Sequence, residues 1–259
     1  PALIKAIYEI TPVFEAAAAA PLAEALAGSN DVPIADSFTA IEQHYLTILR
    51  QEENRPDVWS ELGTAYFLTE RYEDARTAFL QAIDLDPTIA AYHYSLGLVL
   101  EKLAIVAAAA QAYQQAIALD PDFMAAYNNL GNLVAEHGDP QQAEQIYQQA
   151  IARNSSYAGN YLNLGNVLLV QGNAEAAIVA YESALKLEPD HADVPANLQF
   201  AHELAQDPLQ LWQFAASSLF RRQRYQAAAG FYEQLLAAHQ TDVESYQALA
   251  HCYHQLNQY

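Results

Sequence analysis

Small and apolar residues repeat along the chain at a fixed period of 34 residues between positions 56 and 191. In each period a leucine–glycine pair is followed by an alanine, an aromatic residue and a second alanine at constant offsets. Such self-similarity is the signature of a repeat protein, and we expect two helices per period. The glycines of this series are Gly63, Gly97, Gly131 and Gly165, and the aromatic residues are Phe79, Tyr113, Tyr147 and Tyr181.

Each repeated position has a physical role in a pair of helices. A small residue is needed where the two helices approach closely, and a large one fills the gap against the next pair. Pro87, Pro121 and Pro189 follow the second helix of three repeats and end it, because the residue before a proline disfavours the helical conformation. Two helices cannot bury their apolar faces alone, so the pattern predicts an all-α solenoid of stacked pairs.

These positions resemble the tetratricopeptide repeat (TPR), and the resemblance covers residues 56–191 without a gap. It implies an all-α, right-handed superhelix in which the first helix of each pair, helix A, lines a concave groove. We therefore assign four regular repeats to residues 56–191.

The N-terminal region, residues 1–55, departs from the regular pattern. Residues 37–52 have the phase of a second helix, which makes them half of a degenerate repeat. Its partner is expected at 12–27 after a short helix at 3–10, with a longer loop at 28–35.

The pattern also changes after residue 191. Residues 192–206 match a first helix, yet the next match starts at Pro208, only half a period later. Two interpretations stay open: 192–207 is a capping helix before a second array, or it pairs with 209–222 as one degenerate repeat. Residues 208–259 hold one further repeat and the first helix of another, so the chain is expected to be a fragment of a longer protein.

Composition narrows the class of partner. The chain has 11 basic and 31 acidic residues and a net charge of −20, which repels nucleic acid and anionic membrane surfaces. No stretch approaches the roughly 18 apolar residues of a membrane span. Its single cysteine, Cys252, excludes an internal disulfide and favours a reducing compartment, so we expect a cytoplasmic location.

Asparagines gather at helix-A positions that packing does not use. An asparagine amide carries both a donor and an acceptor and suits the main chain of an extended peptide. The strings at 129–132 and 163–166 resemble the asparagine ladder of O-GlcNAc transferases and SPINDLY-like glycosyltransferases. The resemblance implies a peptide-binding groove, and the alternative is that these asparagines form a solvated face or bond locally to a neighbouring helix. The candidate residues are Asn129, Asn132, Asn163, Asn166 and Asn197.

Charge in the groove bears on the ligand. The dicarboxylate clamp of some TPR proteins needs lysines and an arginine beside asparagines, and none of the matching positions here is basic. Acidic residues outnumber basic ones among the positions expected to face the groove, so a neutral or basic protein or peptide is favoured.

Two further clusters invite functional hypotheses. Arg221, Arg222 and Arg224 end a predicted helix, where cations suit the helix dipole, and they are also a possible docking patch for an acidic group. His251, Cys252 and His254 offer too few ligands for zinc, so no metal site is assigned.

The sequence contains none of the nucleotide-binding, hydrolase or metalloprotease motifs, so we expect no catalysis and no cofactor. The chain is thus expected to be a protein- or peptide-binding scaffold, with possible self-association through its last, unpaired helix. The alternative is the substrate-recruiting half of an O-GlcNAc-transferase-like enzyme whose catalytic domain follows residue 259.

Overall fold

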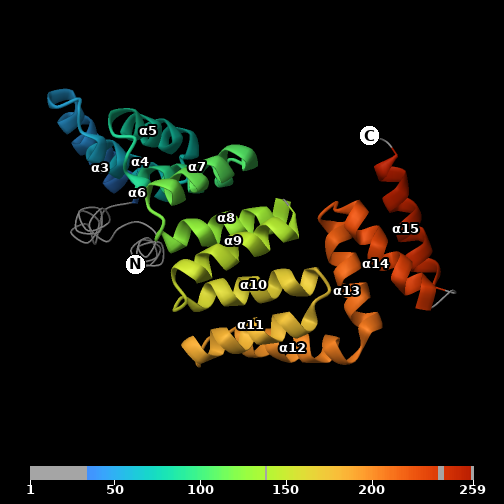
Figure 1. Ribbon diagram of the computed structural model, residues 1–259. Helices are drawn as coiled ribbons and strands as arrows, with labels where there is room; N and C mark the ends of the chain where they lie inside the picture. The colour runs from blue at the N-terminus through green and yellow to red at the C-terminus, as the bar shows by residue number, and fades with distance from the viewer. Residues whose placement is uncertain (1–33, 138, 239–241, 258–259) are drawn as a thin grey trace. The chain divides into compact units, whose positions relative to one another are not determined.

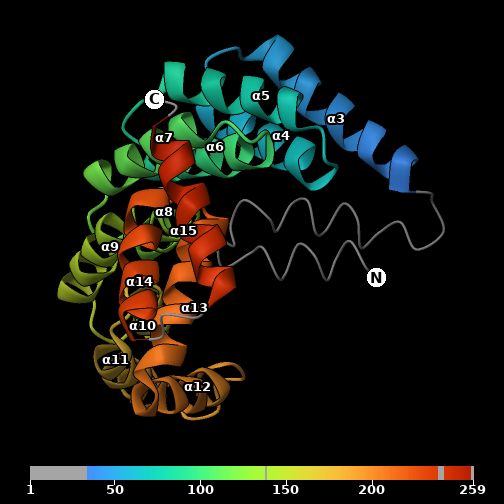
Figure 2. The ribbon, with the colours of Figure 1, turned by 90° about the vertical axis from the view of Figure 1, so that its right-hand side faces the viewer.

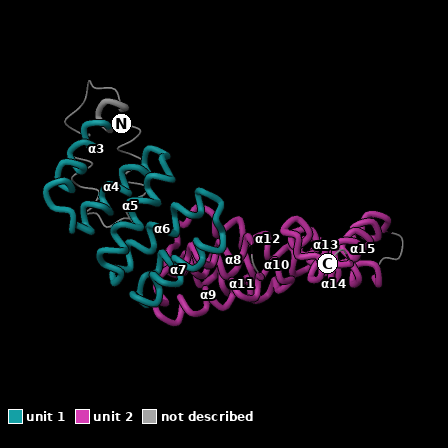
Figure 3. The backbone as a smooth tube through the Cα atoms, turned by 90° about the horizontal axis from the view of Figure 1, so that it is seen from above, with its two compact units in different colours: residues 1–126 teal, residues 127–259 magenta. Residues whose placement is uncertain are grey.

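The computed structural model describes residues 34–137, 139–238 and 242–257 (Figure 1). The helices predicted at 3–10 and 12–27 lie outside these residues. The chain divides into two compact units, residues 1–126 and 127–259 (Figure 3).

Within the described residues every regular element is an α-helix, which confirms the predicted all-α solenoid. Each helix packs mainly on its neighbours in the sequence, as expected for stacked pairs. Unit 1 contains α3 (Ile34–Gln51), α4 (Pro56–Leu68), α5 (Tyr72–Leu85), α6 (Ala90–Lys102) and α7 (Val106–Leu119). Unit 2 begins within α8 (Met124–His137) and continues with α9 (Pro140–Arg153), α10 (Ala158–Val170), α11 (Ala174–Leu187), α12 (Val194–Gln206), α13 (Pro208–Arg221), α14 (Tyr225–Ala238) and α15 (Val243–Leu256).

The glycine–aromatic pairs of the repeat hold the two helices of each pair together. A Cβ placed on Gly97 would lie 2.5 Å from the ring of Tyr113, and one on Gly165 would lie 2.5 Å from the ring of Tyr181. Both rings are fully buried. The residues that repeat every 34 positions are therefore those at which an aromatic ring of the second helix packs directly against the backbone of the first.

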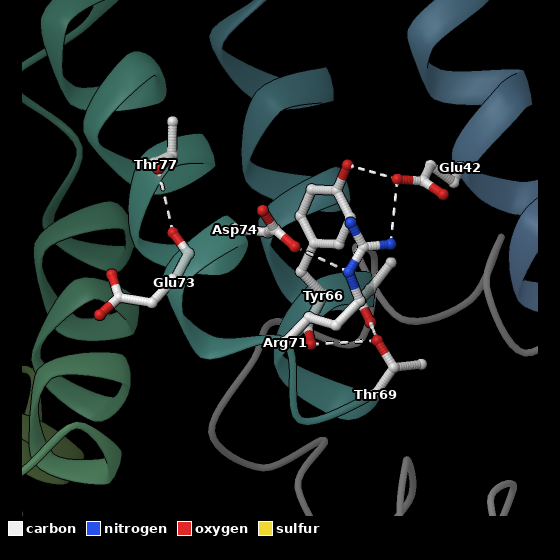
Figure 4. Close-up of polar contacts among 8 residues, drawn as sticks. Glu42, Tyr66, Thr69, Arg71, Glu73, Asp74 and Thr77 are labelled. Atoms are coloured by element: carbon white, nitrogen blue, oxygen red, sulfur yellow. Dashed lines mark hydrogen bonds and ion pairs between the residues drawn. The ribbon is translucent and has the colours of Figure 1, made fainter.

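A polar cluster joins α3 to the α4–α5 pair in unit 1 (Figure 4). The Arg71 guanidinium lies 3.1 Å from Glu42 and 2.7 Å from Asp74, and its central carbon sits 4.4 Å from the centroid of the Tyr66 ring. The Tyr66 hydroxyl donates to Glu42 at 2.8 Å. Burial, followed by this carboxylate, raises the pKa of Tyr66 to about 12. The arginine thus connects three helices.

The turns inside the pairs reveal where the repeat changes phase. The residue that closes such a turn has a positive φ at Glu70, Ala104 and Gly172, which keep the period of 34. The next residue with this conformation is Gln223, one and a half periods after Gly172. Helices α13 and α14 therefore form a pair whose phase is shifted by half a repeat.

The junction between α12 and α13 combines features of both interpretations of residues 192–222. Helices α8–α12 lie side by side, whereas α13–α15 run across that direction (Figures 1 and 2), as a second array would. Trp212 of α13 packs in the same cluster as Phe231 of α14. Yet the Phe200 and Phe214 rings also meet at 5.3 Å, which is the contact expected if α12 pairs with α13.

Candidate functional site

An open cavity of about 1020 Å³ lies inside unit 2. Its walls come from helices α8 and α10, which are helix A of consecutive repeats, and from the α13–α14 turn. We call it the Asn–Arg cavity after six of its lining residues, which are Asn132, Asn163, Asn166, Arg221, Arg222 and Arg224.

Contacts between distant parts of unit 2 bring the α13–α14 turn to this place. Helix α13 packs against α10, and Arg224 donates a hydrogen bond to the carbonyl of His137 at the end of α8. A Cβ placed on Gly172 would lie 2.7 Å from the ring of Phe231, so α14 rests directly on the α10–α11 turn. The α13–α14 turn, which follows the half-period phase shift, thus brings these three arginines to the same cavity as the asparagines.

Two of the cavity asparagines also serve the helix behind them. The hydroxyl of Tyr147 donates to Asn132 Oδ1 at 2.6 Å, and that of Tyr181 donates to Asn166 Oδ1 at 2.8 Å. Burial raises the pKa of both tyrosines, which keeps the hydroxyls protonated as donors. The side-chain oxygens of Asn132 and Asn166 therefore stabilise the packing of the tyrosines. Their amide nitrogens can still donate hydrogen bonds to a ligand.

The remaining predicted asparagines form links between repeats. Asn163 donates to Asn128 at 2.6 Å, and Asn197 donates to Asn166 at 3.3 Å. Asn129 lies on α8 but does not line the cavity, and neither does Asn197. Two asparagine pairs thus link successive repeats in unit 2, and three of the five predicted asparagines line the cavity.

Among the described residues, the arginines of the cavity form no ion pair with an acidic side chain. Arg221 Nε and Arg222 Nη1 reach only backbone carbonyls one turn back in α13, at 3.4 and 3.3 Å. Within the described part of the chain, no carboxylate forms an ion pair with either of them or with Arg224. The acidic residue in the lining is Glu136, whose carboxylate lies 3.9 Å from the imidazole of His137.

In the sequence the asparagines and the arginines are two separate candidates, and the structure places three of each around one cavity. Three further polar lining residues, Glu136, His137 and Gln223, are not among the candidates predicted from the sequence. One signal was present in the sequence: no aspartate or glutamate occurs between Asp207 and Glu233. In a chain with 31 acidic residues, that gap leaves the arginines unneutralised.

The other candidates do not gather into a site. Cys252 is fully buried, and the ring of His251 packs 5.2 Å from that of Phe220. Across the described ranges, no three histidine, cysteine or acidic residues are grouped as metal ligands would be. No described helix is both long and apolar enough to cross a bilayer. Self-association through α15 stays a prediction, although Val243 and Tyr246 are exposed on that helix.

Comparison with solved structures supports the fold assignment. The crystal structure of MamA is 25% identical, with a TM-score of 0.56 over 60% of this chain and 90% of that one. YrrB, described as a TPR protein with an unusual peptide-binding site, is 22% identical with a TM-score of 0.55, over 79% and 99% of the two chains. PilF of Pseudomonas aeruginosa is 21% identical with a TM-score of 0.53, over 77% and 98%.

Comparison with protein families is more specific. No curated protein sequence matches the chain. A family profile described as "TPR repeat" matches residues 63–103 and 106–138, and one described as "Tetratricopeptide repeat" matches 134–196. The matched residues are the ones that carry the 34-residue pattern, and they make up about half of the sequence. This chain belongs to the tetratricopeptide repeat family.

Proposed function

We propose that this chain is a non-catalytic scaffold module that binds an extended peptide segment of a partner protein in the Asn–Arg cavity. The TPR family assignment supports a role in protein interaction. The observation that carries the proposal is the joint lining of one cavity by three asparagines and three arginines. A cavity of about 1020 Å³ is at the upper end of the range for ligand sites and accepts several peptide residues.

Hydrogen bonding explains why a peptide main chain suits this surface. In the described residues, the amide nitrogens of Asn132 and Asn166 donate to no acceptor. They lie on successive helix-A elements, one repeat apart. Backbone carbonyls of an extended segment can accept from both, and this contact needs no particular side-chain sequence.

A solved structure with the same fold supports peptide binding. YrrB has a peptide-binding site according to its description, and we extend peptide binding to this chain as a hypothesis.

The state of the cysteine bears on the cellular location. The single cysteine, Cys252, is buried, and burial raises the pKa of its thiol. A buried, unpaired thiol agrees with a reducing compartment, so we also propose a cytoplasmic location.

Selection from a random dodecapeptide library displayed on phage tests the proposal. The purified chain should enrich peptides that no longer bind after Asn132, Asn163 and Asn166 are all replaced by alanine. The matched control replaces Gln145 and Gln149, exposed amides on α9, by alanine and should bind normally. Failure to enrich any peptide, or equal binding by a folded triple variant, would contradict the proposal.

The second candidate function is recruitment of substrates to an O-GlcNAc-transferase-like catalytic domain. It is supported by the asparagine row, since Asn163 and Asn197 occupy ladder positions and each links to a neighbouring helix A. The gene sequence that follows residue 259 tests this candidate. A glycosyltransferase domain there would support it, whereas a different domain or a stop codon would exclude it.

A further inference from the structure

The arginines of the Asn–Arg cavity concentrate positive charge in an acidic molecule. Three of the 11 basic residues of the chain lie within four positions and line one cavity, although the net charge is −20. The acidic residue in the lining, Glu136, is exposed, so water screens its carboxylate. The cavity is therefore a local positive site.

Two of the acids expected along the groove, Asp57 and Glu101, already have partners within unit 1. In unit 1, Asp57 binds Arg55 at 2.6 Å, and Glu101 accepts from the Tyr113 hydroxyl at 2.8 Å. The prediction of a neutral or basic partner rested on the groove as a whole. The cavity in unit 2 has the opposite local charge, so it selects a different ligand at this one place.

Unused hydrogen-bond donors line the cavity. Arg221 and Arg222 make only long bonds to backbone carbonyls of their own helix. Arg224 Nε is buried without an acceptor among the described residues, an arrangement that is unfavourable unless a ligand supplies the acceptor. Across the cavity, the amide nitrogens of Asn132 and Asn166 also lack acceptors in that part of the chain.

A carboxylate matches this surplus of donors. It accepts about four hydrogen bonds through two oxygens, and a planar guanidinium can donate two of them in parallel. We infer that the Asn–Arg cavity recognises an aspartate or glutamate side chain of the bound peptide through Arg221, Arg222 and Arg224. The inference rests on the proposed peptide-binding function and adds a requirement for acidic sequence.

The same phage-displayed library tests the inference. Its peptides are fused to the coat protein at their C-terminus, so they present acidic side chains but no free terminal carboxylate. The library is selected separately against three proteins, and the peptide sequences in the three selected pools are compared. The proteins are the wild-type chain, the Arg221→Gln/Arg222→Gln/Arg224→Gln variant and the Arg153→Gln variant. Arg153 is exposed on α9 and lies outside the cavity, and no aspartate or glutamate occurs within four residues of it in the sequence, so it controls for loss of charge alone.

We expect wild type and Arg153→Gln to enrich aspartate and glutamate at least fivefold at one peptide position, and the triple variant to lose that enrichment. If Arg224→Gln impairs folding, Arg221→Gln/Arg222→Gln gives the same readout, because Arg224 alone contacts His137. Selection of peptides without acidic enrichment, or enrichment that survives in the arginine variants, would overturn the inference alone. Selection of no peptide would overturn the proposed function as well.

Discussion

Arginines in the two units have opposite surroundings. In unit 1, Arg71 lies between Glu42 and Asp74 at 3.1 and 2.7 Å and over the ring of Tyr66. In unit 2, Arg222 reaches no carboxylate in the described residues, and its nearest acceptor is a carbonyl of its own helix at 3.3 Å. The same residue type connects helices in one unit and lines an open cavity without an acidic partner among the described residues in the other.

The difference between these arginines follows from how close an acidic residue lies to each of them in the sequence. Each paired arginine of unit 1 has an acid two or three positions away, as in Arg71–Asp74, Glu73–Arg76 and Glu52–Arg55. Around Arg222 no acid occurs for more than ten residues on either side. An arginine with a local acid can be satisfied within its own helix pair, whereas Arg221, Arg222 and Arg224 have no acid close to them in the sequence and also line a cavity.

Charge reversal at the turn should have the largest effect. Replacing Arg221 and Arg222 by glutamate should weaken binding of a selected acidic peptide by about a hundredfold or more, since two attractions become repulsions. Arg153→Glu is the matched control and should change affinity less than threefold. Fluorescence anisotropy of the labelled peptide measures the affinity of both variants. An equal loss of affinity in the two would contradict a specific role for the cavity arginines.

Asparagine donors should contribute less than the arginines. Asn132→Asp keeps an acceptor for the Tyr147 hydroxyl but removes the amide donor and adds a negative charge. Acidic-peptide affinity should fall about tenfold, whereas the free energy of unfolding should change by less than about 0.5 kcal/mol. Asn132→Ala instead leaves the buried Tyr147 hydroxyl without its acceptor and should lower the free energy of unfolding by about 1–2 kcal/mol. Urea unfolding measures the stability of the Asn132→Asp and Asn132→Ala variants. Equal free energies of unfolding for the two would contradict the structural role of Asn132 Oδ1.

Removal of a paired arginine should act on stability alone. Arg71→Gln loses two partly exposed ion pairs, with Glu42 and Asp74, and a contact with the Tyr66 ring, so we expect about 1 kcal/mol of destabilisation. Peptide affinity should stay within twofold of wild type. Arg222→Gln should show the reverse, with weakened binding and unchanged urea unfolding. Loss of peptide binding in a folded Arg71→Gln variant would remove the distinction between the two regions.

The smallest effect concerns a titration. The hydrogen bond from Arg55 holds the pKa of the Asp57 carboxyl below its usual value, and Arg55→Gln should return that pKa towards normal. Because the folded-state pKa is lowered, the stabilisation exists above the unfolded pKa of about 3.9 and is lost as pH falls through the folded value. NMR titration of the Asp57 side chain measures this, and an unchanged midpoint in the variant would contradict the pairing.

The fold could be predicted because every repeat position has a local physical cause. Gly165 and Tyr181 must match in size, and Pro189 must end a helix, so the pattern appears in the sequence itself. The family profiles match that same region. The helices predicted near the N-terminus, at 3–10 and 12–27, are outside the described residues and stay predictions.

The cavity could be predicted only in part. Asn132, Asn163 and Asn166 were recognisable because helix-A positions share one face in every repeat. Their meeting with Arg221, Arg222 and Arg224 depends on contacts between α13 and α10 and between Arg224 and His137. Such contacts join residues at least 38 positions apart and leave no periodic signal in the sequence.

The central claim is that the α13–α14 turn binds an acidic peptide side chain, and a double-mutant cycle tests it most directly. The cycle pairs Arg222→Gln with a glutamate-to-glutamine change at the enriched position of a selected peptide, with Arg153→Gln in a parallel cycle. The account predicts coupling of at least about 1 kcal/mol for Arg222, which is roughly fivefold in affinity, and none for Arg153. Strictly additive losses at Arg222, in variants that remain folded, would contradict it.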